Sequence, residues 1–311
     1  MERGLLVIGD VVTDVVARHR GPLAPATDTA AEIRTLPGGA GANAACWAAH
    51  SGLTDVRILA RVGTDSAAWH EEQLRHAGVR PHLVRDAETP TGTVISLVDA
   101  GAERTFLSDN GAALRLSPAD WSPSLLDGVT HLHLSGYLFF SDTSRATARL
   151  ALREARGRGV TVSVDPASAG FIAGLGVDRF LAAVAGADVL LPNVDEARLL
   201  TGLPEPGDAA AKLSRRFPLV AVTLGADGAL LAAAGGVTAR VPPVPAEAAD
   251  STGAGDAFTG AFLAARLSGA GGSRGNDVGA AAAGCRAGAH AVTVIGGRPP
   301  LRGTADPPGS G

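Results

Sequence analysis

The residues with the clearest chemical potential lie in a glycine-rich stretch from Asp250 to Gly260. Gly253 and Gly255 flank Ala254 and precede Asp256 and an apolar run typical of a helix. Glycines permit positive φ and a close ligand, and a helix N-terminus offers unpaired N–H groups and a positive dipole end. This combination predicts a phosphate site. A carboxylate there would repel phosphate, so we expect Asp256 to act as a general base. The alternative is a residue that only stabilises the first helical turn.

A second glycine-rich start of a helix runs from Pro37 to Ala49 and formally contains G-x-G-x-x-A between Gly39 and Ala44. That fingerprint binds dinucleotides when it directly follows a buried strand, whereas Pro37 and a poor strand pattern precede it here. A nucleotide-dependent oxidoreductase is therefore a remote alternative. Asn43, in the first turn, is a candidate to hydrogen-bond a sugar hydroxyl, and the alternative is a local helix cap.

Acidic residues also follow predicted strands. Residues 5–8 form a buried strand that ends at Asp10, and Asp14 follows four residues later. Ligands of α/β folds bind at the carboxyl ends of parallel strands, so both aspartates are substrate candidates, with turn-forming roles as the alternative. The strand 160–165 also has an acidic tip. His131 and His133 share one strand face, and without a third ligand nearby we expect buried or edge histidines rather than a metal pair.

The elements that must position these residues form an α/β pattern. From residue 129 strands alternate with helices, which predicts a mainly parallel sheet covered on both faces. Residues 17–36 are polar and contain two prolines, and residues 91–98 and 103–107 read as an antiparallel hairpin. We expect these excursions to pair as a small separate sheet. Residues 303–311 have the composition of a disordered tail.

Composition excludes several classes of protein. The net charge of −4 gives no sign of a nucleic-acid or anionic-membrane partner. No apolar run reaches the roughly 18 residues of a membrane span, and the N-terminus is too short for a signal peptide. Cys46 and Cys285 fit reduced core cysteines of a cytoplasmic protein. The single lysine, Lys212, rules out a GxxxxGK[ST] P-loop and the V-A-I-K strand of protein kinases.

Four motifs occur in the order typical of one family. They are Gly38–Asn43, Asn193–Glu196 (N-x-x-E), Thr223–Gly228 (T-x-G-x-x-G) and Asp250–Asp256. The chain resembles the ribokinase-like carbohydrate kinases of the phosphofructokinase-B type over residues 4–298. The resemblance implies a three-layer α/β/α fold with a mainly parallel central sheet and a small β-sheet lid. One kinase domain would span residues 1–302, with lid segments at about 15–37 and 90–108.

The resemblance also implies a role for each motif. Asp256 would activate the substrate hydroxyl, and the backbone N–H groups of Gly253, Ala254 and Gly255 would receive the γ-phosphate. Asn193 and Glu196 would hold Mg²⁺ through waters. Asp250 would lie at a monovalent-cation site, which could take K⁺. The sugar site would comprise Asp10, Asp14, Gly38, Gly39 and Asn43, and the ATP site Asn193, Thr223, Gly225, Asp227, Gly228, Gly255 and Cys285.

By this resemblance we expect an ATP-dependent kinase that phosphorylates a primary hydroxyl of a sugar, as ribokinases and fructokinases do. A nucleoside kinase for adenosine or pseudouridine is the alternative, but a base needs an aromatic platform and Phe106 is the only aromatic residue of the lid hairpin. Intact Asp256 and its glycines argue against a non-catalytic sugar-binding relative. The family's lid often makes a homodimer, which we expect here.

Three positions bear on the substrate. Ribokinases often carry lysine where this chain has Ala40, and a substrate-binding asparagine where it has Val12, which speaks against ribose itself. Arg104, in the lid hairpin, could approach an acidic or phosphorylated substrate, and a solvated hairpin residue is the favoured alternative.

Overall fold

A nine-stranded sheet forms the centre of the computed structural model, which describes residues 3–101, 104–269 and 276–300. The strand order is β13-β12-β11-β10-β9-β8-β1-β4-β5. Strands from β11 to β5 are parallel to their neighbours, and β12 and β13 add an antiparallel edge, so the predicted mainly parallel sheet is confirmed. The strands are β1 Gly4–Ile8, β4 Val56–Gly63, β5 Arg80–Asp86, β8 Val129–Ser135, β9 Thr161–Asp165, β10 Val189–Leu190, β11 Leu219–Thr223, β12 Ala229–Ala233 and β13 Gly236–Val241.

Helices cover both faces of this sheet because its strands are apolar on both sides. Along β1, Leu6 and Ile8 belong to one buried cluster, and Leu5 and Val7 belong to the other. The predicted three-layer fold is therefore confirmed. The first cluster includes residues of α3 Asp142–Gly157, α4 Ala169–Leu175, α5 Val177–Ala183, α6 Val194–Thr201 and α7 Pro206–Leu213; the second includes residues of α1 Ala40–His50, α2 Ala67–His76, α8 Ala254–Ser268 and α9 Asp277–Ala291.

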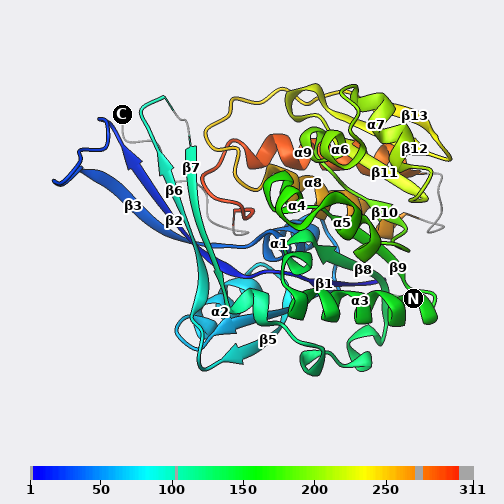
Figure 1. Cartoon of the computed structure of the whole chain (residues 1–311), viewed down its shortest axis with the longest axis horizontal. Coiled ribbons are helices and arrows are strands. Elements are labelled where there is room, and N and C mark those ends of the chain that lie inside the picture. Colours follow the sequence, from blue (N-terminus) through cyan, green and yellow to red (C-terminus); the bar gives the residue numbers. More distant parts are fainter. Residues whose placement is uncertain (1–2, 102–103, 270–275, 301–311) are drawn as a thin grey trace.

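The lid is a separate four-stranded sheet that projects from the body of the molecule (Figure 1). Its order is β3-β2-β6-β7, with β2 and β6 parallel and the outer pairs antiparallel. The predicted lid is confirmed, and its strands reach closer to the central sheet than the expected segments did. They are β2 Val12–His19, β3 Ala31–Gly38, β6 Thr91–Val98 and β7 Arg104–Gly111.

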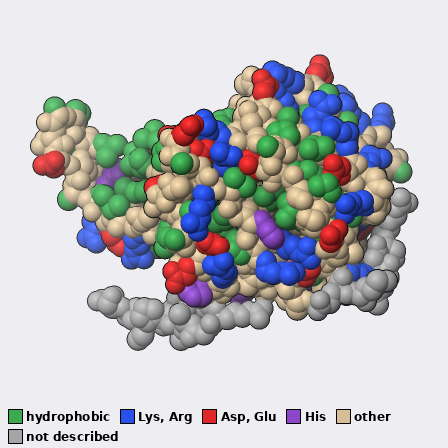
Figure 2. All heavy atoms as spheres, turned by 90° about the horizontal axis from the view of Figure 1, so that it is seen from below, with side chains coloured by type: hydrophobic (Ala, Val, Ile, Leu, Met, Phe, Trp, Pro, Cys, Tyr) green, Lys and Arg blue, Asp and Glu red, His purple; other side chains and the backbone are tan. Residues whose placement is uncertain are grey.

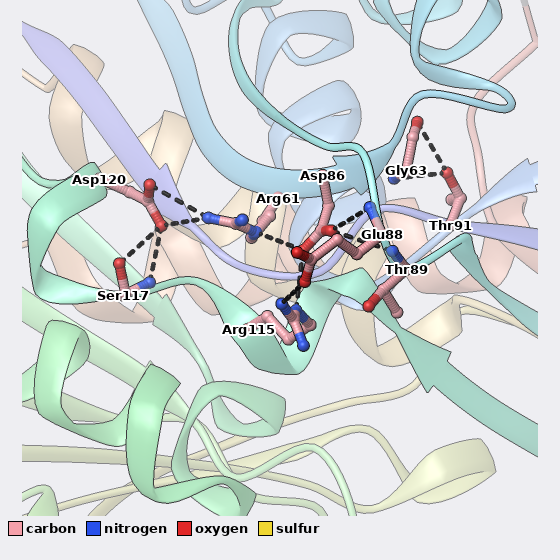
Figure 3. A network of polar contacts seen from close by, with 9 residues as sticks. All are labelled: Arg61, Gly63, Asp86, Glu88, Thr89, Thr91, Arg115, Ser117 and Asp120. Carbon is pink, nitrogen blue, oxygen red and sulfur yellow. Dashed lines mark hydrogen bonds and ion pairs between the residues drawn. The ribbon is translucent and has the colours of Figure 1, made fainter.

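Polar contacts fasten the base of the lid to the central sheet (Figure 3). At the start of β6, the Thr91 hydroxyl accepts a hydrogen bond from Gly63 N, at the end of β4, at 3.0 Å. Arg61 of β4 joins Asp86 of β5 at 2.8 Å and Asp120 at 2.9 Å. Backbone and arginine donors hold the pKa of Asp86 well below its usual range. The bond between Gly63 and Thr91 therefore ties the start of the lid strand β6 to the end of β4.

Figure 2 shows one face of the molecule, on which basic and acidic side chains are interspersed. Within residues 3–101, 104–269 and 276–300, no helix is both long and apolar enough to cross a membrane. The predicted tail, residues 303–311, lies outside the described residues.

Candidate active site

A cavity of about 480 Å³ lies where the lid meets the carboxyl ends of the central strands. The sequence motifs that lie far apart along the chain come together in its wall. The candidate residues that line it are Asp10, Asp14, Gly39, Asn43, Asn193, Glu196, Thr223, Gly253, Ala254, Gly255 and Asp256.

Helix α8 begins at Ala254, directly after Gly253, which has a φ of 73°. A Cβ at Gly253 would lie 2.4 Å from Gly297 Cα, so only glycine fits this turn. Gly255 differs from our expectation, because it has no positive φ and a Cβ there would meet nothing within 4 Å. Its missing side chain leaves the first turn of α8 open to the cavity, where a phosphate could approach the backbone.

The two glycine-rich motifs are joined by one hydrogen bond. Asn43 of α1 donates from Nδ2 to Oδ2 of Asp256 at 2.9 Å. Asn43 lines the cavity, while its Oδ1 is shielded from solvent and has no hydrogen-bond partner among the described residues. Burial, and then the nearby carboxylates led by that of Asp165, raise the pKa of Asp256 well above its usual value, while the bond from Asn43 opposes the rise. Asn43 therefore favours the ionised state that a general base needs.

Asp14 lies on β2 with its carboxylate against the backbone of Gly38. A Cβ at Gly38 would lie 2.2 Å from Asp14 Oδ2, so the close approach requires glycine. Burial, reinforced by the charges of Asp10 and Asp250 and opposed by Arg298, raises the pKa of Asp14 to about 7. The group is thus balanced between its two protonation states near neutral pH.

Asp10 has a well-defined structural role. Its carboxylate accepts hydrogen bonds from Ala40 N at 2.8 Å, Gly41 N at 3.1 Å and Ser135 Oγ at 2.8 Å. These contacts cap the start of α1 and tie it to the end of β8. Asp10 lines the cavity, but its role as a direct sugar ligand stays a prediction.

Asn193 and Glu196 form a capping box at the start of α6. Glu196 N donates to Asn193 Oδ1, and Asn193 N donates to Glu196 Oε2, both at 2.9 Å. Such a box stabilises a helix by itself. Glu196 is also buried beside Asp165 of β9. Burial, then the charge of Asp165, raises the pKa of Glu196 to about 8, and burial raises that of Asp165 to about 6.

Two buried neighbouring carboxylates, of which Asp165 raises the pKa of Glu196, form a donor set suited to a hard divalent cation, whose charge would offset their negative charges. Mg²⁺ usually keeps several waters and takes one or two protein carboxylates together with substrate phosphates. The residues present therefore fit Mg²⁺. Asp165 was seen in the sequence only as an acidic strand tip. That position, at the carboxyl end of a strand, was the signal that could have placed it in the site.

The structure brings only some of the expected ATP-binding residues to the cavity. Thr223, at the end of β11, pairs with Asn193 in an isolated bridge and lines the cavity. Gly225, Asp227 and Gly228 form the following turn and lie outside the wall of this cavity. Cys285 lies half-buried on α9, against the apolar cluster beneath α8. Their ATP-binding roles stay predictions.

Asp250 is buried and joins two loops. It accepts from Thr252 N at 2.8 Å and from Gly296 N at 2.9 Å. The loop before α8 is thereby fixed to the segment after α9.

The histidine pair is buried, as expected. His131 Nε2 and His133 Nδ1 both hydrogen-bond Ser163 Oγ at 2.8 Å. Burial lowers the pKa of both rings. No group of three or more metal-ligating side chains occurs in the part of the chain that the structure describes.

No local pattern in the sequence indicates the aromatic wall of the cavity. Besides Phe106 of the lid, Tyr137 and Phe171 line the cavity, and their rings lie 5.8 Å apart. Tyr137 lies in a short helical turn, 136–140, after β8, and Phe171 lies on α4. Because the two residues are far apart in sequence, only the fold brings them together.

The remote oxidoreductase alternative loses its structural basis. A dinucleotide fingerprint must join a strand of the central sheet to its helix. Here the G-x-G-x-x-A segment is reached from β3, an antiparallel strand of the lid. The single lysine does not line the cavity. Lys212, on α7, donates from Nζ to the carbonyl oxygen of Thr201, on α6.

Comparisons with known proteins agree with this geometry. Residues 2–302 match the model of the pfkB family carbohydrate kinases. A fructokinase of Klebsiella pneumoniae is 31% identical over 276 residues, covering 85% of this chain and 84% of the relative. An ATP-dependent ribose-1-phosphate kinase of Halopiger xanaduensis is 34% identical, with 85% and 84% covered.

Solved structures show the same fold. A ribokinase of Thermotoga maritima superposes with a TM-score of 0.80 at 27% identity, covering 95% of this chain and 94% of its own. A structure described as a ribokinase II of E. coli, in complex with ATP and Mg²⁺, has a TM-score of 0.82 at 25% identity, with 95% and 94% covered. With a family model matched over nearly its whole length, the chain belongs to the pfkB family of carbohydrate kinases, phosphotransferases that act on an alcohol group.

Proposed function

We propose that this kinase transfers the γ-phosphate of ATP to a primary hydroxyl of an uncharged sugar, as ribokinases and fructokinases do. The observation that carries the proposal is the position of Asp256. Its carboxylate stands at the N-terminus of α8, is held by Asn43 and shares one cavity with Asp14. One cavity thus contains a candidate general base, a candidate anion site and a carboxylate that can accept a hydrogen bond from a hydroxyl.

The roles of these residues follow from their chemistry. Asp14 and Asn43 hydrogen-bond sugar hydroxyls and orient the reactive one. Asp256 takes its proton as the oxygen attacks phosphorus. The N–H groups of the first turn of α8 stabilise the charge on the transferred phosphoryl group. Asp165 and Glu196 would hold Mg²⁺, which neutralises phosphate charge when bound.

The charges of the cavity support a neutral acceptor. Five carboxylates line it, and no lysine, arginine or histidine is among the described residues of its wall. A second phosphate or carboxylate would meet these groups without a compensating cation. The side chain of Arg104 lies outside the described residues, so a charged acceptor remains an outcome to test.

A nucleoside kinase is the second candidate. The cavity has more aromatic surface than the lid hairpin alone provides, because Tyr137 and Phe171 line it together with Phe106. Phe106 is 52% exposed and Phe171 is 38% exposed. Aromatic faces of this kind can stack against a base.

A panel of acceptors would separate these candidates. ADP release should be measured with D-ribose, D-fructose, adenosine, pseudouridine, fructose 6-phosphate and a sugar acid. The proposal expects turnover of a neutral sugar and none of the charged compounds. Preferred turnover of a nucleoside would select the second candidate. Turnover of fructose 6-phosphate that is lost in Arg104→Gln would reject the neutral acceptor.

We also propose that K⁺ binds beside Asp250 and shapes the loop before α8. The proposal is supported by the way Asp250 joins that loop to Gly296. Activity should rise when K⁺ replaces tetramethylammonium at constant ionic strength. Equal rates in both salts would reject the proposal.

Finally, we propose a homodimer formed through the lid, in the cytoplasm. The dimer is supported by Ile33 and Leu107, which lie on lid strands with 64% and 54% of their surfaces exposed. Apolar side chains of this size are more often found in contacts than in water. The cytoplasmic location is supported by the free thiols of Cys46 and Cys285.

A further inference from the structure

Arg298, which follows α9, places a guanidinium group behind the proposed sugar site. Its Nη2 donates to Gly38 O at 3.3 Å. Nε and Nη1 are shielded from solvent and have no hydrogen-bond partner among the described residues. Leaving charged N–H groups buried and unpaired is unfavourable, and arginine does not escape by losing its proton. The cost of burying these N–H groups must therefore be offset by a favourable interaction elsewhere.

Gly38 connects Arg298 to Asp14. The guanidinium group binds the carbonyl of Gly38, and the Asp14 carboxylate rests on the same residue, where a Cβ would lie 2.2 Å from Oδ2. The two opposite charges thus contact one glycine at the junction of lid strand β3 and helix α1. Each charge lowers the cost of burying the other.

The groups that face Asp14 are mostly acidic. Asp10 and Asp250 raise its pKa, and Asp256 faces it across the cavity. On α2, His70 hydrogen-bonds the neighbouring Thr13 at 3.1 Å, and burial followed by the charge of Arg298 lowers its pKa to about 4, so it is neutral.

Helix α1 contributes no positive charge either. It presents the Cys46 thiol, whose pKa burial raises, and the amide of Asn43. The positive charge of Arg298 opposes the rise in the pKa of Asp14.

We propose that Arg298 is a positioning residue for the acceptor, whose positive charge on the other side of Gly38 favours the ionised form of the Asp14 carboxylate. This inference rests on the proposed function in that Asp14 accepts hydrogen bonds from the hydroxyls. An ionised carboxylate accepts several hydroxyl hydrogen bonds, whereas a protonated one gives up part of that capacity. Without Arg298, burial and the surrounding carboxylates would hold Asp14 protonated at neutral pH.

Direct titration of Asp14 tests the inference without any substrate. Aspartate carboxyl carbons are labelled with ¹³C and followed by NMR, with the Asp14 signal assigned from Asp14→Asn. The midpoint, about 7 in the unmodified chain, should rise by about one pH unit or more in Arg298→Gln, since a nearby opposite charge shifts a carboxyl by about that amount. Arg298→Lys, which retains the charge, should stay near the original midpoint.

Arg34→Gln is the matched control. Arg34 lines the same outer groove as Arg298 but pairs with Glu32 at the surface, so its loss should leave the Asp14 midpoint unchanged. An unchanged midpoint in Arg298→Gln would overturn the inference. If that variant does not fold, a clearly raised midpoint in Arg298→Lys would do the same.

Kinetics give a second readout, with D-ribose and D-fructose as acceptors. In Arg298→Gln the acceptor KM should rise at least about fivefold at pH 7, because the ionised fraction of Asp14 falls by that factor when its midpoint rises by one unit. It should recover by pH 9, while kcat and the KM for ATP hold. A rise that is equal at every pH would mark a merely structural residue and overturn the inference. If the unmodified chain phosphorylates neither sugar, the proposed function fails, and the NMR titration still decides the role of Arg298.

Discussion

At the scale of single residues, Asp256 combines a fixed position with a variable charge. Asn43 holds its carboxylate at 2.9 Å, while burial and the neighbouring acids favour its protonated form. Substrate and Mg²⁺ would both favour the ionised form, because hydroxyl donors and cations stabilise a carboxylate. The base would thus become competent as the site fills.

Asp256→Asn tests this role. Asparagine keeps the shape and can still accept from Asn43 Nδ2, but its amide cannot take a proton at neutral pH. Since a general base contributes about 10²–10⁴-fold, kcat should fall by about that factor, with KM values nearly unchanged. Thermal unfolding should change by no more than ~1 kcal/mol, the usual size of a charge–dipole effect. A folded variant that retains more than about a tenth of the original kcat would leave Asp256 as a helix-stabilising residue only.

At the scale of elements, α6 links structure to the metal site. Its capping box occupies one oxygen of Glu196. Burial, and then the negative charge of Asp165 on β9, raise the pKa of this residue. Glutamine can close the same box, so Glu196→Gln separates the two roles. The variant should fold normally, need more Mg²⁺ for half-maximal rate and have a lower kcat.

Asp195→Asn is the control, because Asp195 lies in the same turn with its side chain 75% exposed. It should leave the Mg²⁺ titration unchanged. An unchanged titration in Glu196→Gln would remove Glu196 from the metal's surroundings.

The same carboxylates predict how stability depends on pH. The folded-state pKa values are about 8 for Glu196 and about 7 for Asp14, both above the values in the unfolded chain. The folded state therefore binds more protons than the unfolded state. The free energy of unfolding should therefore fall between pH 7 and 8.5 in EDTA. Below pH 7, the buried histidines 131 and 133 act in the opposite direction.

Mg²⁺ binds the ionised carboxylates and should flatten this dependence. Chemical denaturation at pH 7 and 8.5, with EDTA or with excess Mg²⁺, measures both effects. Stability that rises with pH in EDTA would contradict the assigned burial of these groups.

The sequence predicted the parts of the site that local rules govern. Asp14 follows the predicted first strand and lies on β2, and Asp256 lies in the first turn of α8 after Gly253. Positions after the carboxyl ends of parallel strands meet at one edge of the sheet. Local rules also have a limit: Asn193 and Glu196 matched a motif, yet their visible hydrogen bonds form a helix cap. Tyr137 and Arg298 could not be found, because their places depend on contacts between segments distant in sequence.

At the scale of the whole molecule, the lid is the most distinct feature. It projects from the body in Figures 1 and 2 and carries exposed apolar residues. Ile33→Asp should therefore shift the proposed dimer towards monomer in sedimentation velocity, because a buried charge opposes association. Val278→Asp is the control, since Val278 is 53% exposed on α9, away from the lid. A chain that is monomeric before mutation, or a dimer that Ile33→Asp leaves intact, would reject the lid interface.

A kinase that holds ATP before its acceptor arrives must avoid transferring phosphate to water. In the empty cavity, burial and the nearby acids raise the pKa of Asp256, so a smaller fraction of this group can take a proton from a water molecule beside the γ-phosphate. The raised pKa would thus slow idle hydrolysis, in addition to any exclusion of water by the lid. Phosphate release from ATP alone should therefore increase as the pH is raised. The increase should be absent in Asp256→Asn.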